Sequence, residues 1–223
     1  MYRWINCYIC PLMRKIILIV LMLAAGLSMK AQYPGYAVVA DLVKFKTEFA
    51  AATQKTISIK SDFVQEKNLS MLSEKITSKG KFWFKKESQV RMEYNHPYQY
   101  LMILNKDKVF VKDGQKENKI STKSNKIFQQ INKIMIDCMQ GTALANPDFK
   151  TRIFENKNSS LVELIPLTKA MKDLFKTITV IVDKKDYSVT SIEMLELSGD
   201  NTIIRFLNKE LNADIPDVLF TVK

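Results

Sequence analysis

Few residues in this chain have the chemistry of a catalyst. His96 is the only histidine, and its setting in Asn95-His96-Pro97-Tyr98 is more typical of a turn than of a general base. A histidine-based metal site needs more than one such ligand, and six glycines leave little room for a loop that cradles a phosphate. The nucleophile pattern GxSxG and the zinc pattern HExxH do not occur in the sequence. We therefore predict that the protein is not an enzyme and that it holds neither a cofactor nor a metal ion.

The carboxylates and thiols have structural explanations. Asp62 and Glu66 are spaced so that they share one face of a strand, where a solvated surface accounts for both. Cys7 and Cys10 have the spacing of a redox pair, but they precede an export signal and have no folded context. Cys138 falls on the apolar face of a predicted helix, where a buried and inert thiol is expected.

The N-terminus has the three regions of a secretory signal peptide. Arg14 and Lys15 precede an uncharged apolar run over residues 16–27, and a short segment with small residues follows up to Ala31. We place the cleavage after Ala31, and residues 1–12 could be an upstream mis-start. An uncleaved anchor is the alternative, although the run is shorter than the about 20 apolar residues that a membrane-spanning helix needs. The sequence therefore predicts an exported protein.

Charge and length describe the chain that remains after processing, residues 32–223. The full sequence carries 34 basic and 23 acidic residues, and four basic residues belong to residues 1–31, so 30 against 23 remain, a net charge near +7. The export signal and the scattered lysines argue against nucleic acid as a partner. An anionic membrane surface, an acidic protein partner and a merely solvated surface stay open. Residues 32–223 contain no linker or repeat, which predicts a single domain, and we expect a monomer.

The segment Gly80–Tyr94 alternates between apolar and polar residues. Because the side chains of a strand point alternately to opposite faces, this alternation predicts two strands that share one apolar wall. The wall residues are Phe82, Phe84, Val90, Met92 and Tyr94, whereas the opposite face carries Lys81, Lys85, Arg91 and Glu93. Large, adaptable side chains on one face of an exported protein without catalytic residues indicate that it holds something apolar.

Two segments have the spacing of amphipathic helices. Asp41 can cap the first, in which Phe45 and Phe49 fall on one face, up to Thr53. The second, Ser124–Gln140, is followed by Gly141 as a stop. Its apolar face comprises Ile127, Phe128, Ile131, Ile134, Met135 and Cys138. Both helices must cover an apolar surface.

The other segments predict a meander of antiparallel strands. The predicted strands are Ile57–Lys67, Thr77–Lys85, Gln89–Tyr94, Tyr100–Leu104, Lys108–Lys112, Lys150–Glu155, Leu161–Ile165, Lys176–Asp183, Ser188–Leu197, Thr202–Asn208 and Val218–Val222, with a short helical turn within Thr168–Phe175. Strands in this number, with helices at the start and in the middle, predict an α+β fold in which a strongly curved antiparallel sheet wraps around the helices.

A series of short motifs follows a fixed order along residues 32–223. The motifs are a Phe-x-Gln-x-Lys strand (Phe63–Lys67), a glycine-started aromatic strand with a basic pair (Gly80–Lys86), an apolar-polar-apolar strand with a later proline (Val90–Met92 and Pro97), a Leu-x-Pro element (Leu164–Pro166), a glycine turn before a Thr-x-Ile-x-Phe strand (Gly199–Phe206), and a closing segment (Ile215–Phe220). In this order and spacing they resemble the LolA family of periplasmic carriers of outer-membrane lipoproteins. Each motif alone is weak, but the order over nearly the whole exported chain is specific.

The resemblance implies an incomplete β-barrel closed by an α-helical lid, with an apolar cavity that shields the acyl chains of a lipoprotein in the periplasm. It also implies three kinds of partner: acylated lipoproteins, an inner-membrane release complex and an outer-membrane acceptor. In the family, an arginine of the basic pair holds the lid shut. Lys86 stands at that position here, and because lysine lacks the planar fork of arginine, we expect a weaker latch or none.

On this basis we assign residues to a cavity and to a lid. The predicted acyl-chain cavity comprises Phe63, Phe82, Phe84, Val90, Met92, Tyr94, Met102, Leu104, Leu164, Ile178, Val180, Ile204 and Phe206. The predicted lid comprises Phe45, Phe49, Ile127, Phe128, Ile131, Ile134 and Met135. Two alternatives stay open: a LolA-like protein that binds or senses another envelope lipid or glycolipid, and a non-carrier interaction module with a filled core. Periodicity by itself does not separate a filled interior from a vacant one.

Overall fold

The computed structural model describes residues 33–221, except residues 87, 107, 115 and 122–125. The chain divides into two compact units, Met1–Tyr36 and Ala37–Lys223, and the helices and strands described below belong to the second. The predicted signal peptide, residues 1–31, lies outside the described residues. In the described part of the chain, no helix is both long and apolar enough to cross a membrane.

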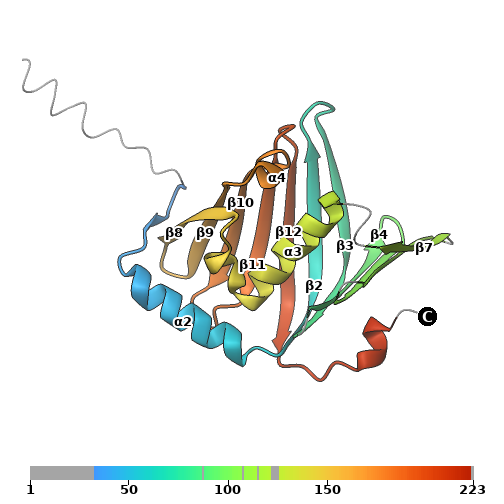
Figure 1. The fold of residues 1–223 in the computed structure, drawn as a ribbon, viewed down its shortest axis with the longest axis horizontal. Coiled ribbons are helices and arrows are strands. Elements are labelled where there is room, and N and C mark those ends of the chain that lie inside the picture. The colour runs from blue at the N-terminus through green and yellow to red at the C-terminus, as the bar shows by residue number, and fades with distance from the viewer. Residues whose placement is uncertain (1–32, 87, 107, 115, 122–125, 222–223) are drawn as a thin grey trace, which may run out of the picture. The chain divides into compact units, whose positions relative to one another are not determined.

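A single curled sheet of twelve antiparallel strands forms the frame of the second unit (Figure 1). The strands are β1 (Ala37–Val38), β2 (Ser58–Leu69), β3 (Glu74–Lys85), β4 (Gln89–His96), β5 (Tyr100–Asn105), β6 (Lys108–Asp113), β7 (Lys116–Ser121), β8 (Phe149–Glu155), β9 (Ser159–Pro166), β10 (Phe175–Asp183), β11 (Val189–Glu196) and β12 (Asn201–Leu211). Their order across the sheet is β1-β8-β9-β10-β11-β12-β2-β3-β4-β5-β6-β7. Because β1 and β7 stand at opposite ends of this order, the sheet is open. The prediction of an unclosed, curved antiparallel sheet is confirmed.

The pairing of β12 with β2 joins the two halves of the sheet. The two strands are antiparallel, with Phe206 opposite Phe63. The ladder continues from β2 to β3 with Ile59 opposite Phe84, and from β3 to β4 with Phe84 opposite Val90. Residues opposite each other in a ladder point to the same face of the sheet. These apolar side chains therefore form one continuous wall.

Two helices, α2 (Leu42–Lys55) and α3 (Lys126–Gln140), lie on the same face of the sheet in Figure 1. α2 begins after Asp41 as predicted, and the Asp41 carboxylate accepts a hydrogen bond from the backbone N–H of Lys44 at 2.8 Å. α3 ends before Gly141, whose left-handed φ of 75° is available to glycine without strain. Three short turns are η2 (Thr142–Ala145), α4 (Lys169–Lys172) and η3 (Asp217–Phe220).

The prediction of a closing strand at Val218–Val222 is wrong over its described residues. Asp217–Phe220 form the 3₁₀ turn η3 instead, which packs on the outer face of the sheet. Phe220 is fully buried there in a cluster with Ile103, and its carbonyl oxygen accepts a hydrogen bond from Asn105 Nδ2 at 3.2 Å. The segment thus buries Phe220 against the face of an existing sheet and leaves Val218 exposed, so it does not need to extend the sheet as a strand.

The sequence patterns do not predict β1 and β7. β1 is only two residues long, and β7 has the mostly polar sequence KENKIS, which lacks a period-two alternation of apolar residues. Both stand at the edges of the sheet. The position of an edge strand follows from main-chain pairing with one neighbour, for which the side chains carry little signal.

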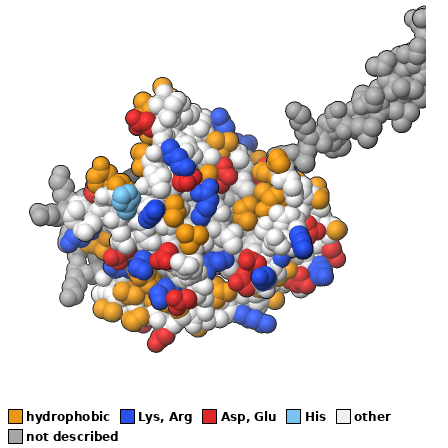
Figure 2. All heavy atoms as spheres, turned by 180° about the vertical axis from the view of Figure 1, so that it is seen from behind, with side chains coloured by type: hydrophobic (Ala, Val, Ile, Leu, Met, Phe, Trp, Pro, Cys, Tyr) orange, Lys and Arg blue, Asp and Glu red, His pale blue; other side chains and the backbone are white. Residues whose placement is uncertain are grey.

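The outer face, which points away from the two helices, carries basic and acidic side chains that are interspersed (Figure 2). Asp62 accepts a hydrogen bond from Asn208 at 2.9 Å and pairs with Lys81 at 3.3 Å, and these contacts hold the pKa of Asp62 below its ordinary value. Glu66 pairs with Lys75 at 2.9 Å. The two carboxylates of the sequence pattern therefore belong to a solvated, charge-paired sheet surface.

Candidate functional site

The residues assigned to the cavity lie together on the inner face of the sheet. Apart from Tyr94, which is partly buried, each of them is buried, and all of them belong to or pack against one hydrophobic cluster. They come from strands that are far apart in the sequence: β2 to β5 contribute one side of the wall, and β9, β10 and β12 contribute the other. The inner face is therefore apolar across most of the sheet. The acyl-chain cavity itself remains a prediction.

Aromatic side chains make the closest contacts within this inner face. The rings of Phe82 and Phe206 lie 4.9 Å apart between centroids, and the ring of Phe63 meets that of Tyr94 edge-on at 4.9 Å. The Tyr94 hydroxyl donates a hydrogen bond to Gln65 Oε1 at 3.0 Å. Burial raises the pKa of Tyr94 far above its ordinary value, so the phenol remains a neutral donor. The Tyr94 hydroxyl is thus the paired polar end of a ring that lies on an apolar wall.

The two helices cover the wall with the residues predicted for the lid. On α2, Phe45 and Phe49 are buried and stack with their centroids 5.6 Å apart. On α3, Ile134 and Met135 are buried, and Ile131 packs against the same cluster. The side chains of the two other predicted lid residues, Ile127 and Phe128, lie outside the described part of the chain. The described lid residues thus pack directly on the wall.

Polar contacts fasten α2 to the sheet side of the fold at its last turn and near its middle. The Lys86 ammonium donates to the backbone carbonyl of Gln54 in the last turn of the helix, where the helix dipole favours a positive charge. Near the middle of the helix, the Tyr187 hydroxyl donates to Glu48 at 2.5 Å. Burial and the Glu48 carboxylate raise the pKa of Tyr187 to about 12, so this donor stays protonated over the physiological range. Lys86 therefore lies where a latch on α2 would have to lie.

Removing the Lys86 contact should loosen the end of α2. We expect Lys86→Met to speed amide hydrogen exchange in the last turn of Leu42–Lys55 by about two- to fivefold, because a cation at a helix C-terminus contributes about 0.5–1 kcal/mol. Lys86→Arg should preserve protection or increase it. The control is Lys85→Met, which removes the other member of the basic pair and its contact with Asp217 at 2.5 Å on the outer face. Equal exchange in α2 for the wild-type protein, Lys86→Met and Lys85→Met would show that Lys86 does not hold the end of the helix.

A close contact also joins the two helices to each other. A Cβ added to Gly141, just after α3, would lie 2.6 Å from Oγ1 and 2.7 Å from Cγ2 of Thr53 on α2. We expect Gly141→Ala to lower the free energy of unfolding by about 2 kcal/mol, because a left-handed φ of 75° strains alanine and the new methyl group pushes Thr53 away. The control is Gly114→Ala, at a φ of 56° with no atom within 4 Å of the added Cβ. Chemical denaturation should show the smaller loss, about 1 kcal/mol, for Gly114→Ala; equal losses would mean that the helix contact is loose.

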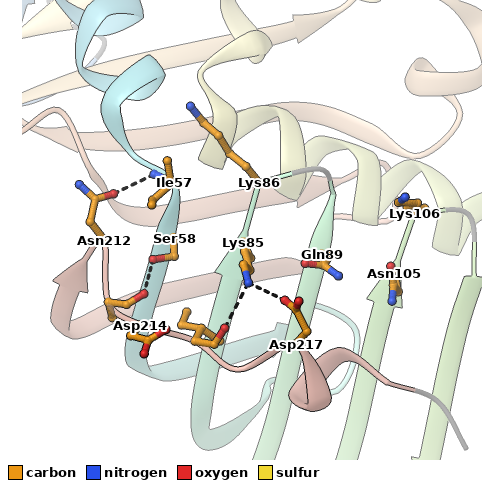
Figure 3. Close-up of a pocket in the computed structure, with 12 residues that line it drawn as sticks. Ile57, Ser58, Lys85, Lys86, Gln89, Asn105, Lys106, Asn212, Asp214 and Asp217 are labelled. Carbon is orange, nitrogen blue, oxygen red and sulfur yellow. Dashed lines mark hydrogen bonds and ion pairs between the residues drawn. The ribbon is translucent and has the colours of Figure 1, made fainter.

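A polar groove lies at one end of the strands, beside the end of α2 (Figure 3). It has a volume of about 760 Å³ and is lined by Ile57, Ser58, Lys85, Lys86, Gln89, Asn105, Lys106, Asn212, Ala213, Asp214, Ile215 and Asp217. The segment after β12 forms one wall and is tied to β2, because Asn212 Oδ1 accepts from the backbone N–H of Ile57 at 2.8 Å and the Ser58 hydroxyl donates to the carbonyl of Ala213 at 2.6 Å. The sequence analysis missed this groove, because its lining comes from five separate segments.

Sequence reasoning also missed part of the inner wall. Further buried residues in the same cluster include Ile59, Val109, Val111, Val182, Ile192 and Met194. Their alternation within predicted strands is a signal that could have found them. Tyr187 packs against Phe45 and Phe49 from the turn between β10 and β11, with ring centroids 6.0 and 6.4 Å away. No local pattern marks a turn residue for that position.

The side chains with metal-ligating or nucleophilic chemistry can be placed within the described residues. Among them, no cluster of three or more His, Cys, Asp or Glu side chains could hold a metal ion. Cys138 is buried as predicted, and burial raises the pKa of its thiol, which keeps it protonated and unreactive. His96 stands at the end of β4, next to Pro97. What this arrangement offers chemically is an apolar surface, a helical cover and a polar groove at its edge.

The comparisons with known proteins agree with this architecture. The family model described as outer membrane lipoprotein carrier protein LolA matches residues 54–223. Among curated proteins, no match to the sequence is found. The crystal structure of MucB has a TM-score of 0.50 and 13% identity over 83% of this chain and 64% of that chain. A LolA superfamily protein from Nitrosomonas europaea has a TM-score of 0.43 and 8% identity over 82% of this chain and 99% of that chain. The lipoprotein LppX of Mycobacterium tuberculosis has a TM-score of 0.42 and 10% identity over 76% of this chain and 94% of that chain. At such identities, the structural likeness is one of fold.

Proposed function

Since the chain belongs to the LolA family of outer membrane lipoprotein carrier proteins, we propose that it is a periplasmic chaperone that binds the acyl chains of lipoproteins and carries them from the inner to the outer membrane. The proposed partners are acylated lipoproteins as cargo, an inner-membrane complex that releases them to the carrier, and an outer-membrane acceptor. We propose that the mature protein begins after Ala31 and acts as a monomer. The description of the family names a carrier and not an enzyme.

The observation that carries this proposal is the continuous apolar inner face of an open sheet, covered by two helices. Phe63, Phe82 and Phe206 lie in one buried cluster with Phe45 and Phe49 of α2. An apolar face of this extent must be kept from water, and a helix can do this as well as the acyl chains of a ligand can. A bound acyl chain could therefore take the place of a helix against the apolar inner face.

The energetics of acyl transfer require such an interior. Each methylene exposed to water costs about 0.8 kcal/mol, so a chain with on the order of ten methylenes is held in a membrane by roughly 8 kcal/mol. A wall of phenylalanine, valine and methionine offers an environment like hydrocarbon, which makes transfer from bilayer to protein close to neutral. Met92 and Met102 are both buried in this wall, and their unbranched side chains adapt to ligands of irregular shape.

Binding requires the cover to move, because the lid residues and the wall form one packed cluster in the described conformation. We propose that α2 moves away from the wall. Its apolar contact depends on Phe45 and Phe49, each worth about 1.5–3 kcal/mol when transferred out of water, and its polar contacts include those of Lys86 and Glu48. A bound acyl chain of several methylenes offsets a cost of that size.

A permanently filled core is the second candidate, and the close packing of Phe82 on Phe206 under α2 and α3 favours it. In that case the protein would act as an interaction module without a lipid ligand. Binding or sensing of another envelope lipid or glycolipid is a variant of the first proposal, with the same interior and a different ligand.

Analysis of what the protein retains when it is purified from its native envelope separates these functions. Co-purified acylated lipoproteins support the carrier function, and free lipids or glycolipids without lipoproteins support the variant. A protein that retains neither, and that does not bind a fluorescent fatty acid added to it, has a filled core and contradicts the proposal. Mass spectrometry of the extracted lipids, together with immunodetection of bound lipoproteins, gives the readout.

A further inference from the structure

Three turns lie side by side at one end of the sheet, opposite to the end that holds the polar groove. β2 ends there and β12 begins there, because Asn68 lies opposite Asn201. β10 begins beside the end of β11, because Phe175 lies opposite Glu196. Figure 1 shows that the β2–β3 hairpin projects furthest at this end. We call the three turns together the turn end, which comprises residues 69–76, 167–176 and 197–200.

Large apolar side chains are exposed at the turn end. Met71 is 92% exposed and Leu72 is 64% exposed, both at the tip of the β2–β3 hairpin. Ile76, Leu167 and Leu197 are each about half exposed. Single exposed apolar side chains need no explanation, but a group of them in adjacent turns is typical of an interaction site.

Hydrogen bonds join the three turns to one another. The backbone N–H and the hydroxyl of Ser70 both donate to the Asp200 carboxylate, at 2.9 and 3.0 Å. These bonds hold the pKa of Asp200 below its ordinary value, so the acceptor is ionised at neutral pH. The backbone N–H of Leu197 donates to the carbonyl of Leu174, just after α4, at 3.0 Å. The exposed apolar side chains therefore belong to one connected surface.

Positive charge without an acidic partner borders this surface. Four lysines at this end of the sheet are exposed and make no ion pair within the described residues: Lys150 of β8, and Lys169, Lys172 and Lys176 in and after α4. Asp173 is the acidic residue among them. In the neighbouring turns, Glu196 pairs with Lys67 at 3.3 Å, whereas Glu74 has no basic partner in the described part of the chain. The lysines thus exceed the free carboxylates.

We propose that the turn end docks on an anionic lipid bilayer, with Met71 and Leu72 inserted among the lipid headgroups and the four lysines beside the phosphates. Apolar insertion and the attraction of basic residues to anionic lipids add to each other in such docking. An acidic protein is the other partner with suitable charge, but a stable protein interface takes about 800 Å² from each side. The projecting tip of one hairpin suits a bilayer better, because insertion needs only a few side chains. This inference goes beyond the carrier function, since it concerns the membrane surface and not the cargo.

The test of the apolar tip is co-sedimentation of the protein, purified from its native envelope, with lipid vesicles. We expect vesicles of phosphatidylglycerol and phosphatidylethanolamine to bind the wild-type protein at least tenfold more tightly than vesicles of phosphatidylcholine. The double variant Met71→Glu/Leu72→Glu should weaken binding to the anionic vesicles at least tenfold. The matched control is Val43→Glu/Val218→Glu, which adds the same two charges at side chains that are 76% and 71% exposed outside the turn end. It should change the binding less than threefold.

A second pair of variants tests the lysines. Lys169→Gln/Lys172→Gln should weaken binding to the anionic vesicles about tenfold, since each lysine near an anionic surface contributes roughly a factor of five. The control is Lys157→Gln/Lys185→Gln, which removes the same charge from exposed lysines in the turns at the opposite end of the sheet. The effect of the control should be less than threefold.

An environment-sensitive fluorophore shows which part of the surface enters the bilayer. Cys138 is buried, so a thiol reagent should label the exposed cysteine of Met71→Cys in preference to it. We expect nitrobenzoxadiazole at this position to gain fluorescence several-fold on addition of anionic vesicles. The same label on Val218→Cys, in η3, should not respond.

Two results would overturn the inference: a wild-type protein that does not bind anionic vesicles, and turn-end variants that bind them no more weakly than their controls. A label at position 71 that stays in water would overturn it as well. Failure of the carrier function has a different sign. A protein that binds vesicles through the turn end and binds no fluorescent fatty acid would contradict the proposed function, while the docking surface would stand.

Discussion

Replacing Val90 with glutamate is expected to abolish acyl binding and to lower the free energy of unfolding by about 4 kcal/mol. Val90 is 1% exposed on the inner wall, opposite Phe84 of β3 and Leu104 of β5. A carboxylate at this position would be buried among apolar side chains, and an acyl chain would have to pack against it. Titration with a fluorescent fatty acid and unfolding in urea measure the two effects.

The matched control is Val64→Glu, which makes the same change on the outer face. Val64 lies opposite Lys79 of β3 and Arg205 of β12, so the new carboxylate remains hydrated and gains basic neighbours. Its stability should change by less than about 0.5 kcal/mol, and acyl binding should be unchanged. The comparison shows whether the loss of binding and stability depends on where the carboxylate lies, or only on the addition of a negative charge.

A milder variant keeps the test valid if Val90→Glu does not fold. Val90→Thr preserves the shape of the side chain, costs about 1–2 kcal/mol for a buried hydroxyl, and should weaken acyl binding several-fold in a folded protein. Wild-type affinity in a folded Val90→Thr protein would contradict the assignment of Val90 to the acyl-binding wall.

The second large effect is expected for Gly80→Ala, which should lower the free energy of unfolding by about 3 kcal/mol. An added Cβ would lie 2.0 Å from the carbonyl oxygen of Glu93 and 2.8 Å from Cε1 of Phe63. The first of these atoms belongs to the backbone of β4, so the pairing of β3 with β4 must shift. The second belongs to the ring that packs on Tyr94. The substitution therefore disturbs both the ladder and the wall.

The neighbouring substitution Lys79→Ala is the control for Gly80→Ala. Lys79 is exposed on the outer face, so its loss should change the stability by less than about 0.5 kcal/mol. Urea unfolding measures both variants, and the near-ultraviolet circular dichroism of the tyrosines should change for Gly80→Ala alone. If the two variants are equally stable, β3 and β4 accommodate a methyl group at Gly80, and the close approach of the Glu93 carbonyl oxygen is not limiting.

Features with a local cause could be predicted from the sequence. The side chain of Asp41 caps α2 because the acceptor and the free N–H of Lys44 are three residues apart. The wall residues Phe82 and Phe84 can be assigned to one face because side chains two positions apart point to the same face in any strand. In such cases the structure follows from the spacing of neighbours along the chain.

Features that depend on distant contacts could not be predicted. The apolar residues of Asp217–Phe220 suit an additional strand as well as they suit a turn, and the decision came from burial of Phe220 beside Trp83 and Ile103 on the outer face. Lys86 was expected from the family resemblance to be a weak latch or none. Its contact with the carbonyl of Gln54 depends on where the end of α2 meets β3.

The sequence by itself determined which residues face inward, because alternation along a strand assigns each side chain to one of two faces. It also determined the family, through motifs in a fixed order. The two helices that cover that face were also predicted, from their apolar stripes and from the family resemblance. Only the tertiary structure decided the polar groove at the end of the strands and the serine hydroxyl without a partner between Ile59 and Phe63. The physical reason is that periodicity specifies a direction, whereas the occupant of the space in that direction depends on sheet curvature and on segments far away in the chain.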